Sequence, residues 1–213
     1  MERLPRIASA AATMNVLLST TYFGPVQWYQ KLYHADEVWI ERCESFQKQT
    51  YRNRCMIATT QGMQALTIPV ERPTASHSTI KDVRISDHGD WRRLHWNAVQ
   101  SAYGESPFFE YYEDDLRPFF ERRWTFLFDF NEEIRQKMCE LIDIQPQVSY
   151  TDNYIKEVKN DFREAIQPKH PAPDADFQPR PYYQVYRQKH GFLPNLSILD
   201  LLLNMGPESI FWL

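Results

Sequence analysis

The stretch STTYFGP, residues 19–25, decides the fold that we predict for this chain. An apolar run, residues 16–18, precedes it as in a buried strand, and its Gly-Pro end supplies a turn. Residues 26–34 then have the pattern of a helix, and residues 38–40 that of a second strand. Strand, turn, helix and strand in this order form a βαβ unit. Because the N-terminus of a helix attracts anions, we expect the functional site at this first turn.

The remaining elements follow from periodicity, turn residues and helix caps. We expect strands over residues 55–58, 65–70, 79–85 and 148–150, the first two joined as a hairpin by Gln61-Gly62. Helices are expected after the N-cap residues Asp90, Ser106, Asn131 and Ser197. The sequence therefore predicts an α/β fold: a mixed sheet begun by a βαβ unit, an inserted hairpin and a helical second half. An α+β arrangement is the alternative.

Three segments divide the chain. Residues 14–150 are expected to form a single α/β domain, and residues 151–181 a loop or linker, since residues 168–181 hold five of the 14 prolines. Residues 182–213 are too short for a domain, so we expect them to pack on the main body. Residues 1–13 precede Met14 and the first strand, and we interpret them as an extension.

Composition excludes several classes of protein. The 213 residues carry a formal net charge of −4, which argues against a nucleic-acid-coating protein. No apolar run is long enough to span a membrane. The three cysteines are an odd number without metal-like spacing, and the histidines show none either, so we expect no metal site and reduced thiols in a cytoplasmic protein. Nothing in the sequence identifies a cofactor.

The polar run QKQTYRNR, residues 47–54, is the second candidate for a binding site. Arg52 and Arg54 are suited to holding phosphate or carboxylate, which arginine binds through two parallel hydrogen bonds. Gln47 and Asn53 are suited to reading a polar substrate. The alternative is a solvated basic loop.

His95 is the candidate catalytic base, and Tyr22 a candidate substrate-binding residue. His95 lies on the apolar stripe of its expected helix, where a histidine is more commonly a hydrogen-bonded core residue. We nevertheless expect Tyr22, Asn53, Arg54 and His95 to converge on one pocket, because ligand clefts of open α/β sheets lie beyond the carboxyl ends of the strands.

The same segments carry a resemblance to a known family. In order along the chain they read STTYFGPVQWYQKLYHADEVWIE, QKQTYRNRC, ALTIPVER, WRRLHWNAVQSAYGESPFFEYY and GFLPNLSILDLLLNMGPES. This succession resembles the WbqC-like family over about residues 15–120 and 182–210. The sequence departs from the family pattern in having Ser-Thr-Thr after the first strand and no Ser-Gly-rich segment after residue 148.

The resemblance implies a function in the synthesis of surface polysaccharide or O-antigen precursors. It further implies group transfer of the aminoacyl- or glycyl-transferase kind, from an anionic small-molecule donor to a sugar-linked or amine acceptor. The rival prediction is a non-catalytic binding or scaffold protein of envelope biogenesis. Such a protein would dock a partner through the Pro-rich segment and the C-terminal tail.

Overall fold

The structure is a computed structural model that describes residues 15–71 and 78–213. The predicted extension, residues 1–13, lies outside the described residues. The strands are β1 (Asn15–Ser19), β2 (Glu37–Glu41), β3 (Arg54–Thr59), β4 (Gly62–Thr67) and β5 (Val148–Tyr150). The α-helices are α1 (Val26–His34), α2 (Trp91–Tyr103), α3 (Phe109–Leu116), α4 (Pro118–Glu121), α5 (Leu127–Leu141), α6 (Arg187–His190) and α7 (Ile198–Met205). Short 3₁₀ helices are η1 (Ile80–Asp82), η2 (His88–Asp90) and η3 (Gly206–Trp212).

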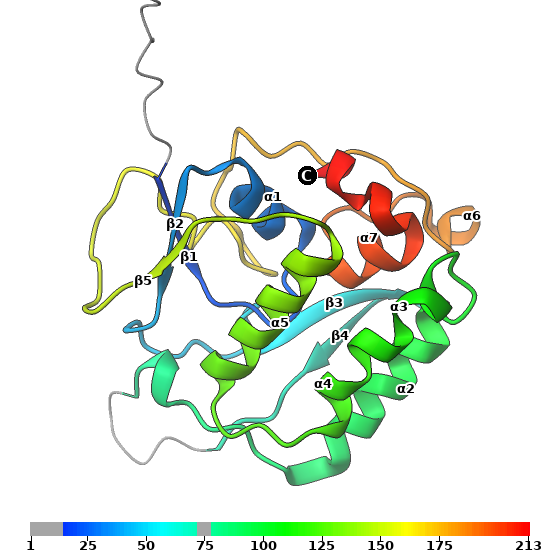
Figure 1. Cartoon of the computed structure of the whole chain (residues 1–213), viewed down its shortest axis with the longest axis horizontal. Coiled ribbons are helices and arrows are strands. Elements are labelled where there is room, and N and C mark those ends of the chain that lie inside the picture. The colour runs from blue at the N-terminus through cyan, green and yellow to red at the C-terminus, as the bar shows by residue number, and fades with distance from the viewer. Residues whose placement is uncertain (1–14, 72–77) are drawn as a thin grey trace, which may run out of the picture.

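The predicted βαβ unit is confirmed. Strand β1, helix α1 and strand β2 follow one another, and β1 and β2 pair in parallel, with Leu17 opposite Trp39. β5 pairs in parallel with β2, so the sheet has the order β1-β2-β5 (Figure 1). Together with the antiparallel hairpin β3–β4 and the helices, this sheet confirms the predicted α/β fold.

A fourth segment extends the parallel sheet beyond β1. Leu17 forms a parallel bridge with Asp161. The Leu17 N–H donates to the Asn160 carbonyl (2.9 Å), and the Phe162 N–H donates to the Leu17 carbonyl (3.0 Å). The chain therefore adds β2 and β5 on one side of β1 and later returns to its other side. Such a reversal of strand order is where open α/β sheets place their ligands.

Helices cover one face of the parallel sheet. Side chains alternate between the faces of a sheet, and Tyr150 lies opposite Ile40 in the register. The Tyr150 hydroxyl donates to Glu132 of α5 (2.8 Å), so α5 packs on this face, and Figure 1 shows α1 on the same side. The opposite face carries Leu17 and Trp39, and within residues 15–71 and 78–213 the loop after β5 is what lies against it, through Ile155 and Val158.

The second half of the fold corrects three local predictions. Residues 79–85 form no strand: Ile80–Asp82 make the turn η1, Thr79, Arg84 and Ile85 make only isolated β-bridges, and the apolar residues Ile80, Val83 and Ile85 are all buried. Helix α5 begins at Leu127, so Asn131 is not its cap but a buried residue inside it. Helix α3 starts only at Phe109, and the Ser106 hydroxyl instead donates to the Tyr103 carbonyl (2.6 Å).

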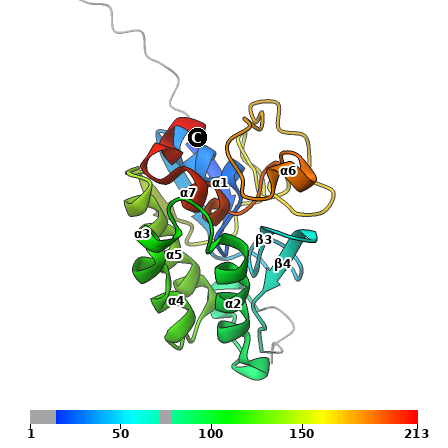
Figure 2. The same ribbon diagram turned by 90° about the vertical axis from the view of Figure 1, so that its right-hand side faces the viewer.

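The C-terminal segment packs on the main body (Figure 2). Helix α7 contacts α1, α2 and α3. The Ser197 hydroxyl accepts a hydrogen bond from the Leu199 N–H, as the cap prediction requires. Residues 168–181 form no helix or strand, and Asp174 in this loop pairs with Lys31 of α1 at 2.9 Å. Over the described ranges, none of the helices has the length and apolar character needed to cross a bilayer.

Candidate functional site

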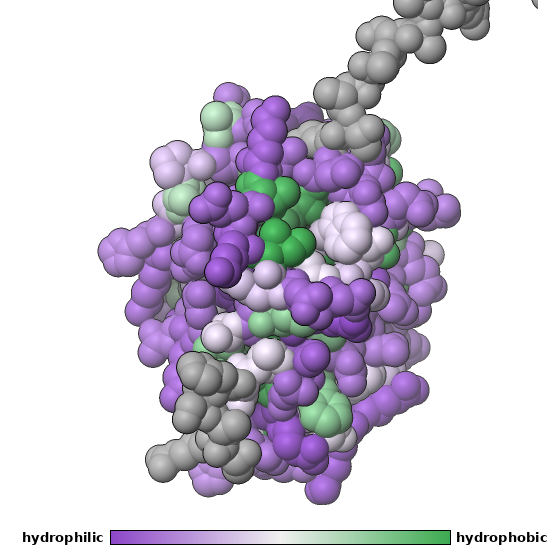
Figure 3. All heavy atoms as spheres, turned by 90° about the vertical axis from the view of Figure 1, so that its left-hand side faces the viewer, coloured by the Kyte–Doolittle hydropathy of each residue, from purple (hydrophilic) through white to green (hydrophobic). Residues whose placement is uncertain are grey.

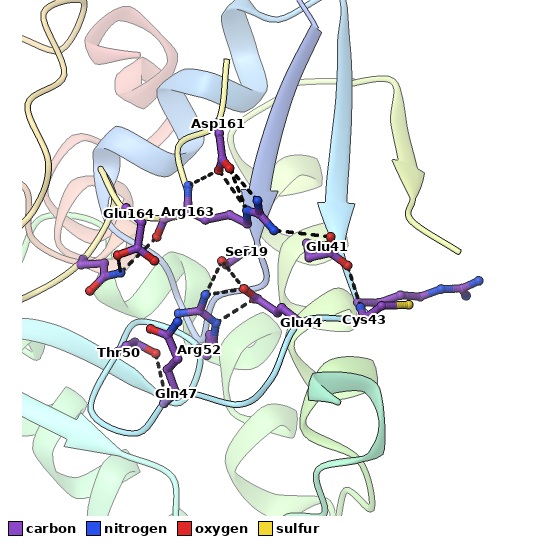
Figure 4. Close-up of polar contacts among 12 residues, drawn as sticks. Ser19, Glu41, Cys43, Glu44, Gln47, Thr50, Arg52, Asp161, Arg163 and Glu164 are labelled. Atoms are coloured by element: carbon purple, nitrogen blue, oxygen red, sulfur yellow. Dashed lines mark hydrogen bonds and ion pairs between the residues drawn. The ribbon is translucent and has the colours of Figure 1, made fainter. Parts of the chain in front are cut away.

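Polar side chains gather where the parallel strands end (Figure 4). Ser19 is the last residue of β1, Glu41 the last of β2, Thr151 follows β5, and Arg163 follows the segment that bridges to Leu17. The carboxyl ends of neighbouring parallel strands meet at one edge of a sheet. This edge therefore collects hydroxyl, carboxylate and guanidinium groups at the point where the strand order reverses.

Arg52 and Glu44 form a buried ion pair at this edge. The Arg52 Nε and Nη2 atoms donate to the two carboxylate oxygens of Glu44 at 2.7 and 2.5 Å, and Nη2 also donates to the Ser19 hydroxyl at 2.7 Å. Arg52 is 2% exposed and Glu44 4%. The Asn131 amide of α5 donates to the Arg52 carbonyl at 2.8 Å. Arg52 thus links the loop after β2, the end of β1 and helix α5.

Arg163 is the second buried arginine. Its Nε and Nη2 atoms donate to Asp161 at 3.0 and 2.6 Å, and Nη2 also donates to the Ile155 carbonyl at 2.8 Å. Its Nη1 atom lies 3.5 Å from Glu41 Oε2 but has no hydrogen-bond partner among the described residues. Burial alone would lower the pKa of Arg163, but the bond and charge of Asp161 outweigh it and raise that pKa. Arg163 therefore stays charged and keeps a donor to spare.

Glu41 holds the loops around this arginine. Its side chain is fully buried, and its Oε1 atom accepts from the Cys43 N–H (2.8 Å) and the Thr151 hydroxyl (2.6 Å). Its Oε2 atom accepts from the Ile155 N–H (2.9 Å). One carboxylate thus ties the loop after β2 to the loop after β5.

A cavity of about 630 Å³ opens beside the two arginines, and we call it the charged cavity. It is lined by Cys43, Glu44, Ser45, Gln47, Tyr154, Lys156, Asp161, Arg163 and Glu164. The lining carries both carboxylates and cationic side chains, so the cavity can bind a ligand that has a positive and a negative group. No cluster of histidine, cysteine and acidic side chains suited to a metal ion occurs in the part of the chain that the structure describes.

A second, small cavity of about 10 Å³ shares Arg163 with the first. The hydroxyls of Thr20 and Thr21 are buried on its wall and have no hydrogen-bond partner within residues 15–71 and 78–213. A volume of this size holds about one water molecule. These two hydroxyls can donate hydrogen bonds to a small polar group at the end of β1.

The N-terminus of α1 differs from the sequence-based expectation. We expected its free N–H groups to attract an anion. The Val26 N–H instead donates to the Leu196 carbonyl (3.0 Å), and the Gln27 N–H donates to the Asn195 side chain (3.0 Å). The segment before α7 thus occupies these donors, and the polar groups of the site come from strand ends and loops.

The structure divides the predicted site residues into two groups. Gln47 lines the charged cavity, and Arg52 lies on the wall of the small cavity that shares Arg163 with it. Tyr22 and His95 meet in the core, where the Tyr22 hydroxyl and His95 Nδ1 are 2.9 Å apart. They are 0% and 6% exposed, and neither lines the charged cavity. Burial lowers the pKa of His95 to about 4, so its imidazole is neutral at pH 7.

Asn53 precedes β3, and Arg54 is its first residue. The Asn53 amide donates to the Ile68 carbonyl (2.9 Å), and Arg54 Nε donates to the Thr67 hydroxyl (3.0 Å). Both bonds join the start of β3 to the end of β4. Neither residue is among those that line the charged cavity. The catalytic and binding roles that the sequence predicts for these residues stay predictions.

Sequence reasoning missed Glu44, Asp161 and Arg163. Glu44 stands only three residues before the polar run, residues 47–54. An acidic partner for the arginines of that run could therefore have been sought at Glu44. The segment around Arg163 has no strand-like pattern, and only its pairing with β1 brings it to the site.

Comparison with known proteins agrees with the resemblance seen in the sequence. "Uncharacterized protein Rv1507c" of Mycobacterium tuberculosis is 27% identical over 218 residues, which cover 91% of this chain and 94% of that protein. No solved structure matches the chain significantly. The profile of the WbqC-like protein family matches residues 20–170, most of the sheet and the whole charged cavity. The chain therefore belongs to the WbqC-like protein family.

Proposed function

We propose that this protein is a group-transfer enzyme that uses the charged cavity to bind an aminoacyl or glycyl substrate. Its acceptor would be an amine or a sugar-linked group of a surface polysaccharide or O-antigen precursor, and the reaction would take place in the cytoplasm. The family resemblance suggests this class of reaction. The observation that carries the proposal is the buried Arg163, which lines a cavity of about 630 Å³ and whose Nη1 atom makes no hydrogen bond among the described residues and lies 3.5 Å from Glu41.

Arg163 is suited to the anionic end of the substrate. A guanidinium that is already fixed by Asp161 loses little side-chain freedom when it binds a carboxylate or phosphate oxygen. Charge-assisted hydrogen bonds of this kind are stronger than bonds between neutral groups. Arg163 would hold the activated donor or its leaving group. The hydroxyls of Thr20 and Thr21 line the small cavity that Arg163 also lines, where they would bind a water molecule rather than the substrate.

The carboxylates on the same lining are suited to an ammonium or amine. Glu164 is exposed on the cavity, whereas Glu44 is occupied by Arg52. We assign amine binding to Glu164 and the positioning of Arg52 to Glu44. In the transfer step the amine nitrogen would attack the acyl carbon, the bond to the leaving group would break, and Glu164 would accept the proton of the amine.

A ligand screen tests this function. Thermal shift is measured with glycine, glycinamide and N-acetylglycine, and then with nucleotides, nucleotide sugars and acyl thioesters, since a bound ligand raises stability by mass action. We expect glycine to stabilise more than either single-charge analogue, and Arg163→Gln to abolish the effect. Arg84→Gln, on an exposed ion pair outside the cavity, is the matched control. Equal responses of the two variants would refute the assignment.

A non-catalytic scaffold is the second candidate. The observation that favours it is the exposure of Phe211 (66%) and Tyr183 (50%) in the C-terminal segment. Such a protein would show no response to any small ligand in the screen and would bind a protein partner through this segment. Loss of that binding in Phe211→Ser would then support the scaffold over the enzyme.

A further inference from the structure

The face of the parallel sheet without helices carries an apolar hollow. Its volume is about 200 Å³, and it is lined by Asn15, Val16, Leu17, Trp39, Ile155 and Val158. Val158 is 43% exposed, so the hollow is open to solvent. Figure 3 shows a small hydrophobic patch on this side of the molecule, surrounded by hydrophilic side chains.

The hollow and the charged cavity share a wall. In the loop after β5, Tyr154 and Lys156 line the charged cavity, whereas Ile155 and Val158 line the hollow. The backbone of this loop is fixed between the two, because the Ile155 N–H donates to Glu41 and its carbonyl accepts from Arg163. The two sites therefore lie on the two sides of one short loop segment, residues 154–158.

The strand register places the hollow near Glu41, the carboxylate that lies beside Arg163. Leu17 and Trp39 form one row across β1 and β2, and Ser19 and Glu41 form the next row on the same face. Rows on one face of a sheet are two residues, roughly 7 Å, apart. The hollow thus begins about one row from the carboxylate that faces Arg163.

We propose that the substrate is an amphiphile, with an anionic head in the charged cavity and a hydrocarbon chain in the apolar hollow. This inference rests on the proposed function of the charged cavity and adds the substrate class. A protein partner fits less well, since a stable interface buries about 800 Å² on each partner, and the patch in Figure 3 is small and ringed by hydrophilic residues. A hydrocarbon chain fills a narrow apolar hollow without needing that area.

A chain-length series tests the proposal. Calorimetry measures the binding of N-acetylglycine, N-butanoylglycine, N-hexanoylglycine and N-octanoylglycine below the concentrations at which they form micelles. Octan-1-ol is the probe that lacks the anionic head group. We expect the affinity to rise about fourfold for each methylene that enters the hollow and then to level off. Octan-1-ol should bind more weakly than N-octanoylglycine. The octanoyl chain should change the fluorescence of the protein but not of Trp39→Phe.

The matched variants are Val158→Asp and Phe211→Asp, each placing a charge at an exposed apolar residue. We expect Val158→Asp to lose the dependence on chain length while still binding N-acetylglycine, and Phe211→Asp to behave as the unchanged protein. Equal affinity along the series would overturn the amphiphile and leave the proposed function intact. If the series binds Arg163→Gln as tightly as the unchanged protein, or if no probe binds, both the amphiphilic substrate and the binding of its anionic head in the charged cavity are refuted.

Discussion

The substitution Glu44→Gln tests the buried ion pair that forms the wall of the site. Arg52 is 2% exposed, and its Nε and Nη2 atoms reach the two oxygens of Glu44 at 2.7 and 2.5 Å. Glutamine keeps one acceptor oxygen but removes the charge, so the guanidinium remains buried without its counter-ion. Removing one partner of a buried pair costs about 3–5 kcal/mol. Because the Ser19 hydroxyl still accepts from Arg52, we expect about 3 kcal/mol.

Urea unfolding followed by tryptophan fluorescence measures this loss. About 3 kcal/mol corresponds to a decrease of roughly 6–12 °C in Tm for a chain of this length. Glu71→Gln is the control, because its partner Arg84 and Glu71 itself are 52% and 53% exposed, and we expect a change within about 0.5 kcal/mol. The double variant Glu44→Leu with Arg52→Met should regain most of the stability. A loss below about 1 kcal/mol in Glu44→Gln at an unchanged m-value would refute the burial of this pair.

Three further predictions concern other buried groups. Burial lowers the pKa of His95 from 6.5 to about 4, so the stability that the neutral imidazole contributes is present above pH 6.5 and is lost as the pH falls towards 4. Urea unfolding at a series of pH values should show a loss of about 3 kcal/mol in the free energy of unfolding, and this loss should be absent in His95→Gln. Burial raises the pKa of Asp200 to about 6, so the stability that the protonated carboxyl contributes is present below pH 3.8 and is lost as the pH rises through 6. Urea unfolding of Asp200→Asn over the same pH range should lack this decline. Asp174→Asn removes the buried partner of Lys31, and limited trypsin digestion should then cleave residues 168–181 faster, whereas an unchanged rate would mean that other contacts hold the loop.

Local sequence signals predicted the first half of the fold well. The apolar run before STTYFGP, the Gly-Pro turn and the periodicity of residues 26–34 all act over short distances, and they yield β1, α1 and β2 as found. The strand predicted over residues 79–85 was wrong because a 3₁₀ turn, η1, followed by isolated β-bridges also buries Ile80, Val83 and Ile85. The prediction of Asn131 as a helix cap was wrong because the sequence does not distinguish a capping asparagine from a buried one, which here donates to the Arg52 carbonyl.

The site was predicted only in part, for a reason that lies in the topology. Gln47 and Arg52 lie in the loop that follows β2, so a strand-end argument places them near the edge of the sheet. Arg163 arrives there because residues 160–162 pair with β1, a contact between segments more than 140 residues apart. His95 and Tyr22 do meet, as convergence requires, but through a hydrogen bond inside the core. Sequence alone does not distinguish a buried polar pair from a catalytic one.

The most direct test of the charged cavity as the functional site is the alkylation rate of Cys43. Cys43 lines the cavity and is partly exposed, whereas Cys55 and Cys139 are buried, so mass spectrometry of iodoacetamide-treated protein reports on one residue. We predict that any compound that raises Tm in the ligand screen also slows the alkylation of Cys43. Both effects should vanish in Arg163→Gln and persist in His95→Gln. A compound that stabilises the protein while Cys43 reacts at its original rate would contradict the assignment of the site.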